Sequence, residues 1–366
     1  MSGKDDRPVV ALYYHPRPRS PSSTDLYKYM RDNSKQFRTI LMTDTANGMT
    51  LEREMEKRNN GKAPDIVMDG FGAWTGLLES NDYIQKNDVK VVRTVGDVEV
   101  HSGTFFTGAG HHRHNTEVFC DALFFPVSPT TPAVERLKYY TEDLLTQMDS
   151  KFICIPFGVD IEKHKPAVNK DIDVLACYVA DVGNHFQDGR IKMKKALGEW
   201  GTYINKCGEQ YNGMKGQEGH EEQPYWPMLK RMFEGCWDHH MDFRIGPNFY
   251  EKYADMCNRS KIALADTSGR NYMTNKYLEF GASECCVIGE VPIGYEDLLN
   301  DDTMIGLDME DVELSLTKEL DHFFFDEEGR KEAGTKARKL RNLIKKDYTI
   351  ERTCEKVEKA LMELLK

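Results

Sequence analysis

Runs of β-branched and aromatic residues recur along the first half of the chain and predict β-strands. The predicted strands cover residues 9–16, 37–43, 65–72, 89–97, 120–127 and 152–158. Helices are predicted between them, at residues 23–34, 51–59 and 132–148. Because the strand runs are continuously apolar rather than alternating in polarity, they indicate a parallel sheet covered by helices on both faces.

The same alternation begins again after a polar stretch at residues 158–173. This stretch carries a proline and lacks hydrophobic periodicity, so it predicts the connection between two domains. Further strands are predicted at residues 173–180, 242–245, 261–267, 286–291 and 303–308, and helices at 190–199, 227–237, 250–259 and 276–279. From Val312 onward the pattern is largely helical and ends in an amphipathic helix at residues 350–365.

A length of 366 residues is more than one hydrophobic core comfortably serves, which agrees with two domains. We expect α/β domains at residues 1–160 and 161–346, followed by a helix at 347–366. In open α/β sheets, ligands bind at the carboxyl ends of the strands, and clefts between domains are favoured pocket sites. The pattern therefore predicts two Rossmann-like domains that face a central cleft.

Composition narrows the class of protein. Hydrophobic residues make up 40% of the chain and charged residues 30%, which is typical of a soluble globular protein. A net charge of −11 argues against nucleic acid as a partner, and no apolar run approaches the ~20 residues of a transmembrane segment. The nine cysteines lack CxxC spacing and are expected as reduced thiols of a cytoplasmic protein, with Cys285 and Cys286 in the core.

The most informative stretch is residues 271–294, where a polar loop leads into a helix and then into a short apolar strand. Thr274 precedes the helix as a candidate N-cap, and the first amides and the helix dipole favour an anion. Lys276 and Glu279 are three residues apart and so lie on one helical face. This arrangement suits a nucleoside diphosphate, with its phosphates at Lys276 and the helix start and its ribose hydroxyls at Glu279.

Three segments also resemble those of a known family. They are IPFGVDIEKHKP at residues 155–166, DIDVLACYVADVG at 171–183 and TNKYLEFGASECCVIGEVP at 274–292. They resemble, in this order, the domain-joining segment, the opening strand and glycine-bearing loop of the donor domain, and the K-x-x-E element of GT-B glycosyltransferases of the group-1 and spore-maturation-like type. In that family the C-terminal helix crosses back onto the first domain, so we expect the same here.

The resemblance implies a hexosyl- or pentosyltransferase that moves a sugar from a UDP- or GDP-sugar to a glycan, a protein or a small hydroxyl acceptor. It implies retention of configuration, and it implies no metal and no other cofactor. Without a metal, the charge that grows on the departing diphosphate must be met by cations and backbone amides, and Arg190 and Lys276 are our candidates. The family often carries two glutamates eight positions apart; Glu279 matches the second, and Asn271 replaces the first.

The candidate residues fall into two groups. We expect the donor to be bound by residues of the second domain, namely Gly183, Arg190, Ser268, Gly269, Arg270, Asn271, Thr274, Asn275, Lys276 and Glu279. In the first domain, Asp97 and His101 follow a strand and are candidates for the general base, although ordinary turn chemistry explains them equally well. Acceptor-side candidates are Tyr14, His15, His111 and His112. The clustered histidines lack a helical pair and an acidic or cysteine partner, so we expect no metal there.

Three alternatives stay open at this point. A nucleotide-sugar epimerase would use the same architecture and consume donor without an acceptor. A non-catalytic GT-B binding module would keep the fold, and Asn271 in place of an acid supports it. An NAD-dependent enzyme is disfavoured, because PRPRSPSST follows the first strand where a glycine-rich turn is needed.

Overall fold

The protein is described by a computed structural model of residues 1–366. The described residues are 6–14, 21–43, 50–70, 80–94, 120–125, 151–175, 189, 192–193, 195–200, 249–267 and 273–366. The chain forms two compact units, Met1–Gly158 together with Tyr348–Lys366, and Val159–Asp347. We call them the first and the second unit.

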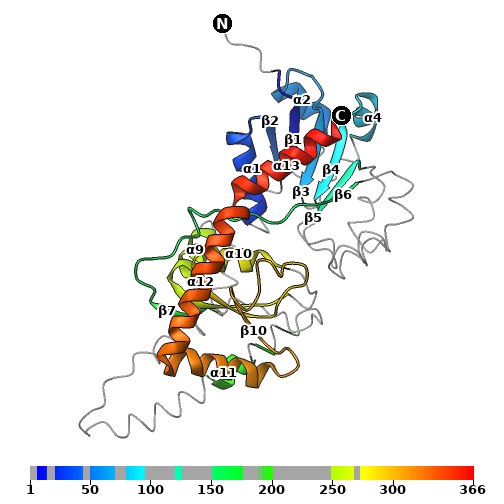
Figure 1. The fold of residues 1–366 in the computed structure, drawn as a ribbon. Helices are drawn as coiled ribbons and strands as arrows, with labels where there is room; N and C mark the ends of the chain where they lie inside the picture. The colour runs from blue at the N-terminus through cyan, green and yellow to red at the C-terminus, as the bar shows by residue number, and fades with distance from the viewer. Residues whose placement is uncertain are drawn as a thin grey trace, which may run out of the picture. The chain divides into compact units, whose positions relative to one another are not determined.

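The first unit contains a six-stranded sheet of order β2-β1-β3-β4-β5-β6, in which every neighbouring pair is parallel (Figure 1). The strands are β1 (Val9–Tyr14), β2 (Arg38–Thr43), β3 (Ile66–Gly70), β4 (Lys90–Thr94), β5 (Ala122–Phe125) and β6 (Lys151–Cys154). The described helices are α1 (Pro21–Asn33), α2 (Leu51–Arg58), α4 (Asn81–Lys86) and α13 (Ile350–Leu364).

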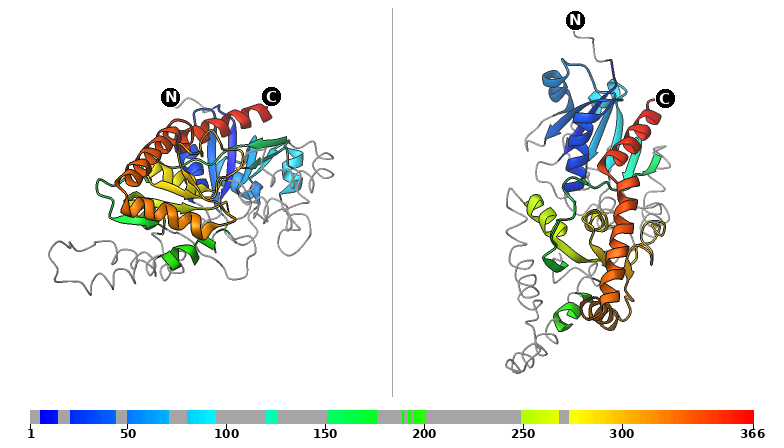
Figure 2. Two further views of the ribbon diagram at one scale, coloured as in Figure 1. Left: turned by 60° about the horizontal axis from the view of Figure 1, so that its bottom comes forward. Right: turned by 60° about the vertical axis from the view of Figure 1, so that its left-hand side comes forward.

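The C-terminal helix α13 completes the core of the first unit. Val10 and Leu12 of β1 pack in one cluster with Val357 and Leu361 of α13, and Figures 1 and 2 show α13 against the sheet next to α1. Gly158 makes this approach possible, because a Cβ there would lie 2.6 Å from Thr353 Oγ1. The C-terminal helix therefore returns to the first unit, as expected.

The second unit contains a four-stranded sheet of order β10-β9-β8-β7, again parallel throughout. Its strands are β7 (Ile172–Leu175), β8 (Ser260–Ala265), β9 (Cys286–Gly289) and β10 (Ile305–Gly306). Its helices include α9 (Phe249–Arg259), α10 (Asn275–Ala282), α11 (Val312–Phe325) and α12 (Glu327–Asp347), and residues 189, 192–193 and 195–200 are helical as well. The predicted fold class, two α/β domains with parallel sheets, is confirmed.

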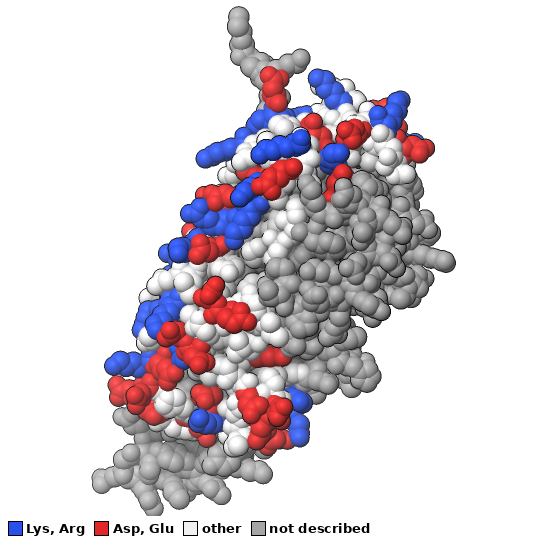
Figure 3. All heavy atoms as spheres, turned by 45° about the vertical axis from the view of Figure 1, so that its right-hand side comes forward, with Lys and Arg blue, Asp and Glu red and all other residues white. Residues whose placement is uncertain are grey.

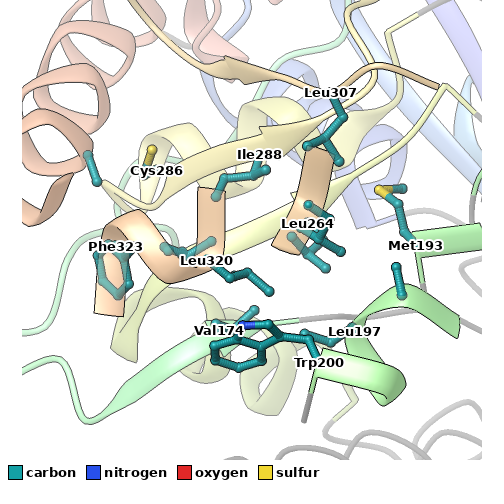
Figure 4. Packing of buried hydrophobic residues seen from close by; sticks show 14 of the residues in the cluster. Val174, Met193, Leu197, Trp200, Leu264, Cys286, Ile288, Leu307, Leu320 and Phe323 are labelled. Carbon is teal, nitrogen blue, oxygen red and sulfur yellow. The ribbon is translucent and has the colours of Figure 1, made fainter. Parts of the chain in front are cut away.

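One face of the second sheet packs against α11 and the helical residues near 200. Figure 4 shows Val174, Leu197, Trp200 and Leu320 converging in this core. The Trp200 indole N–H donates to Asp321 Oδ1 at 2.9 Å, so the one polar group of this large side chain is satisfied. This core stabilises the sheet whose carboxyl edge carries the candidate site.

Several predicted boundaries are wrong. The strand predicted at residues 152–158 ends at Cys154, because Pro156 cannot donate to a sheet ladder. The strand predicted at 286–291 ends at Gly289, and the one at 303–308 shortens to two residues. Helix α4 was not predicted, because its sequence NDYIQK offers a single buried residue, Ile84. The elements predicted at 132–148, 227–237 and 242–245 lie outside the described residues.

Acidic and basic side chains are interspersed over the described part of the face in Figure 3. Helix α12 illustrates the pattern, since Lys336 pairs with Glu332 at 3.2 Å and Lys339 with Asp302 at 2.7 Å. Solvent screens such pairs, so they contribute little to stability.

Candidate functional site

The carboxyl edge of the second sheet gathers polar residues from several strand ends. Thr267 follows β8 and Glu290 follows β9. Because the strands are parallel, these ends lie at one edge, and α10, which follows β8 along the chain, begins near it. Gly189 lies close by, since a Cβ there would be 3.8 Å from Glu290 Oε2 and 3.9 Å from Asp266 Cβ.

Helix α10 starts where it was predicted to start, directly after Thr274. Thr274 has the extended backbone of an N-cap, and its carbonyl accepts from Tyr277 N at 3.2 Å. Thr274 is thus the N-cap residue, as predicted, but its Oγ1 bonds no amide of the helix and is buried without a partner among the described residues. The first amides of α10 are therefore not capped by this hydroxyl, which favours their use by an anionic ligand.

Glu279 lies in the second turn of α10 and is only 6% exposed. Its Oε2 accepts a hydrogen bond of 2.8 Å from the hydroxyl of Tyr253 on α9. Lys276, in the first turn, is half-buried. A buried carboxylate needs donors to replace water, so Tyr253 both stabilises Glu279 and fixes its orientation.

A neutral histidine, His164, packs against the tyrosine of the Glu279–Tyr253 pair. The ring of His164 meets that of Tyr253 edge-on, with centroids 6.1 Å apart. Ser283 Oγ donates to Asn258 Oδ1 at 2.9 Å, which leaves it as the acceptor for His164 Nδ1 at 3.4 Å. Burial is the main cause that lowers the pKa of His164 to about 4, so the ring is uncharged at neutral pH.

Lys170, like His164, belongs to the segment at residues 158–173 that was predicted to connect the domains, and it binds the C-terminal end of α10. Its ammonium donates to the carbonyl oxygens of Ser260 at 2.7 Å, Ser283 at 2.8 Å and Glu284 at 2.7 Å. Desolvation lowers the pKa of Lys170, and the three carbonyls compensate by solvating its charge. The cation lies where the helix dipole is negative, which stabilises the C-terminal turn of α10.

The end of β9 is fixed tightly to the end of β8. Gly289 makes this possible, because a Cβ there would lie 1.7 Å from Ala265 O. The carboxylate of Glu290 then receives two hydrogen bonds on Oε2, from Thr267 N at 3.1 Å and from Thr267 Oγ1 at 2.5 Å. Tyr277 of α10 donates its hydroxyl to Glu290 O at 2.5 Å, so the strand end and the helix start are joined.

The structure brings four of the predicted site residues together in α10 and its cap, namely Thr274, Asn275, Lys276 and Glu279. Of Tyr14 it describes only the backbone, in β1. The remaining candidates lie outside the described residues: His15, Asp97, His101, His111, His112, Gly183, Arg190, Ser268, Gly269, Arg270 and Asn271.

Sequence reasoning missed Tyr253, His164, Thr267 and Glu290 as members of the site. Glu290 follows a strand of a parallel sheet directly, and a search of strand ends for polar residues would have found it. Tyr253 gives no such local signal, because its contact joins two helices that are separated along the chain.

The described cysteines are free thiols, and Cys285 and Cys286 are buried as predicted. Burial raises the pKa of each to about 12, so neither is a thiolate at neutral pH. Within the described ranges, no group of three or more His, Cys, Asp or Glu side chains could hold a metal ion. None of the described helices is long and apolar enough to cross a membrane.

No protein-family model and no curated protein matches the sequence. Solved structures do match the fold. A sucrose-phosphate synthase from Thermosynechococcus elongatus superposes with a TM-score of 0.54 at 11% identity, covering 98% of this chain and 99% of that one. A glycosyltransferase from Rickettsia africae ESF-5 gives 0.52 at 11% identity, with 99% of each chain covered. Anabaena HepE in complex with UDP-glucose gives 0.56 at 10% identity, covering 97% of this chain and 99% of that one.

These similar structures are GT-B glycosyltransferases, and the chain has their fold of two parallel-sheet α/β domains. At such low identity the likeness concerns the fold alone. The spore-maturation-like type named from the sequence stays a prediction.

Proposed function

We propose that the protein is a glycosyltransferase whose nucleoside-diphosphate sugar binds at the carboxyl edge of the second sheet. The observation that carries this proposal is the buried Glu279, held by Tyr253 in the helix that begins near that edge. Anabaena HepE, which has the same fold, has been solved with UDP-glucose, and this supports a UDP-sugar as the first donor to test. The resemblance supports a GDP-sugar as the second.

In the proposed mode the diphosphate meets the first amides of α10 and the ammonium of Lys276. Negative charge grows on the diphosphate as the glycosidic bond breaks, and donors that are already in place stabilise it without reorganisation. Glu279 accepts hydrogen bonds from the ribose hydroxyls. Because Tyr253 holds one carboxylate oxygen, the acceptor is oriented before the donor arrives.

We further propose that the acceptor, a glycan, a protein or a small hydroxyl compound, binds the first unit, with Asp97 or His101 as the general base. Transfer would retain configuration and need no metal. The free thiols among the described cysteines support a reducing compartment such as the cytoplasm.

A thermal-shift panel of UDP, GDP, dTDP, CMP, ADP and NAD tests the donor site. A ligand at about 100 times its dissociation constant should stabilise the protein by ~2.7 kcal/mol. We expect one nucleoside diphosphate to shift wild type and to lose this effect in Glu279→Gln. The control Glu284→Gln removes the same charge at the other end of α10 and should behave as wild type.

Turnover separates the alternatives. The matching nucleotide sugar should release its diphosphate only when an acceptor is present. A changed sugar without any acceptor would identify an epimerase instead, and binding without turnover across a broad acceptor panel would identify a non-catalytic module. A shift with NAD alone, or with no nucleotide at all, would contradict the proposed function.

A further inference from the structure

Glu290 is half-buried, and hydrogen bonds hold one of the two oxygens of its carboxylate. Its Oε2 takes both hydrogen bonds from Thr267, one from the amide and one from the hydroxyl. Its Oε1 takes no hydrogen bond from the described part of the chain. Two donors on a single oxygen fix the plane of the group, so the second oxygen keeps its lone pairs in a defined direction.

The surroundings of Glu290 place it next to the start of α10. The Tyr277 hydroxyl joins the first turn of that helix to Glu290 O, and Gly289 allows the strand end to lie close against Ala265. Gly189 lies beside Oε2, since a Cβ there would be 3.8 Å from this oxygen. The carboxylate thus lies where the end of β8, the end of β9 and the start of α10 meet.

The chemistry of the nucleotide sugar decides which of its groups can bind Glu290 Oε1. An ionised carboxylate only accepts hydrogen bonds, and it repels a phosphate or a second carboxylate. In the proposed mode the diphosphate lies at the start of α10, so the part of the donor attached to it, the sugar, is the neighbour that offers hydroxyl donors.

We propose that Glu290 is a specificity-determining residue whose Oε1 accepts a hydrogen bond from a hydroxyl of a neutral donor sugar. This rests on the proposed function. This role of Glu290 narrows the class of donor sugar. A sugar with a free hydroxyl at this position binds. A sugar that carries a carboxylate there, such as a uronic acid, is rejected because two like charges repel each other.

Isothermal titration calorimetry with matched probes tests the inference. The probes are UDP, UDP-glucose and UDP-glucuronate, or GDP and GDP-mannose if GDP is the diphosphate that shifts wild type. In wild type the neutral sugar should add affinity over the diphosphate. In Glu290→Gln the affinity for the diphosphate should stay within about twofold, while that for the sugar nucleotide falls about tenfold. UDP-glucuronate, where UDP applies, should bind the variant better than wild type.

Two further variants test whether the effect depends on the orientation of the Glu290 carboxylate and on its position. Thr267→Val keeps the amide donor but removes the hydroxyl from Oε2, so the carboxylate loses its fixed orientation and the sugar-specific affinity should fall without a change for the diphosphate. Glu284→Gln removes the same charge two residues before β9 begins, at the opposite end of the strand, and should change neither affinity.

The outcomes are distinguishable. If Glu290→Gln and Thr267→Val weaken diphosphate and sugar nucleotide equally, Glu290 only fixes the strand end, and the inference is wrong. The same holds if the sugar adds no affinity in wild type. If wild type binds no nucleoside diphosphate at all, the proposed function itself fails. Should Glu290→Gln not fold, Thr267→Val alone decides between a sugar-specific loss and none.

Discussion

Tyr253 donates its hydroxyl to a carboxylate that is almost fully buried. In the second unit this donor replaces water at the Glu279 carboxylate, and the contact joins α9 to α10. His164 packs against the Tyr253 ring from the connecting segment. In the proposed binding mode, the ligand contact of Glu279 would therefore depend on Tyr253 and His164 as well.

Tyr253→Phe removes the donor and keeps the ring. We expect the affinity for the nucleoside diphosphate to fall about tenfold, because Glu279 loses its fixed orientation and one compensating hydrogen bond. Tyr83→Phe is the matched control, since the Tyr83 hydroxyl has no partner among the described residues. Calorimetry on both variants measures the effect, and an unchanged affinity in Tyr253→Phe would contradict the role given to Glu279.

His164 makes stability depend on pH in a defined window. Burial lowers its pKa to about 4 in the folded protein, opposed in part by Asp160, against ~6.5 in an unfolded chain. The unfolded state therefore binds more protons below pH ~6.5. Stability is full above that pH and falls as the pH drops toward 4, by up to about 3 kcal/mol. Urea unfolding between pH 4 and 7 should show this slope, and His164→Asn should flatten it.

At the scale of elements, α10 packs against α12 through a glycine. A Cβ on Gly281 would lie 2.4 Å from Ile344 Cδ1 and 2.8 Å from Leu340 Cγ, so the two helices approach closely at this position. Gly334, in α12 itself, would meet nothing closer than Arg338 Nη1 at 3.4 Å. The two glycines share a helical setting and differ in the space around them.

Gly281→Ala should destabilise the protein by about 1–3 kcal/mol, because the added methyl overpacks the contact with α12. Gly334→Ala should stabilise it by about 0.5–1 kcal/mol, because alanine loses less backbone entropy in a helix. Denaturant unfolding of both variants measures the two changes in the free energy of unfolding, which should have opposite signs. A destabilised Gly334→Ala would show that more than backbone entropy acts there.

Sequence patterns predicted those elements whose signals are local. The start of α10 followed from Thr274, and α9 and α11 were expected close to where they lie. The position of Glu290 after a strand could have been noticed, but its pairing could not be predicted, because it depends on Thr267, which is distant along the chain, and on the close approach of Gly289 to Ala265. Thr274 is the N-cap residue that was predicted; that its hydroxyl caps no amide could not be predicted, since the burial of this hydroxyl is set by tertiary packing.

At the scale of the whole molecule, the first unit contains two pieces of chain. Residues of α13 are as deeply buried as those of the central strands; Val357 and Leu361 belong to the same core as Val10 and Leu12. Gly158 and Thr353 form the close contact where the chain leaves the first unit and returns to it. The resemblance predicted this return, and the amphipathic pattern of the last helix agreed with it.

Leu361→Ala should cost about 2–5 kcal/mol through lost burial and a residual cavity. Glu363→Ala, on the exposed face of the same helix, should lie within about 0.5 kcal/mol of wild type. Hydrogen exchange localises the effect: amides of β1 and α1 should exchange faster in Leu361→Ala, while those of β8 should not change. Faster exchange in both units would show that they unfold together.

The return of α13 also has a consequence for synthesis on the ribosome. Domains usually fold as they emerge, the N-terminal one first. Here the first unit lacks part of its core until α13 leaves the exit tunnel, and all of Val159–Asp347 leaves the tunnel before α13 does. We therefore expect the second unit to reach its native state earlier, with the amino-terminal sheet exposed and dependent on chaperones in the meantime. Chains truncated after Asp347 and released from the ribosome should be protease-resistant in the second unit and sensitive in the first.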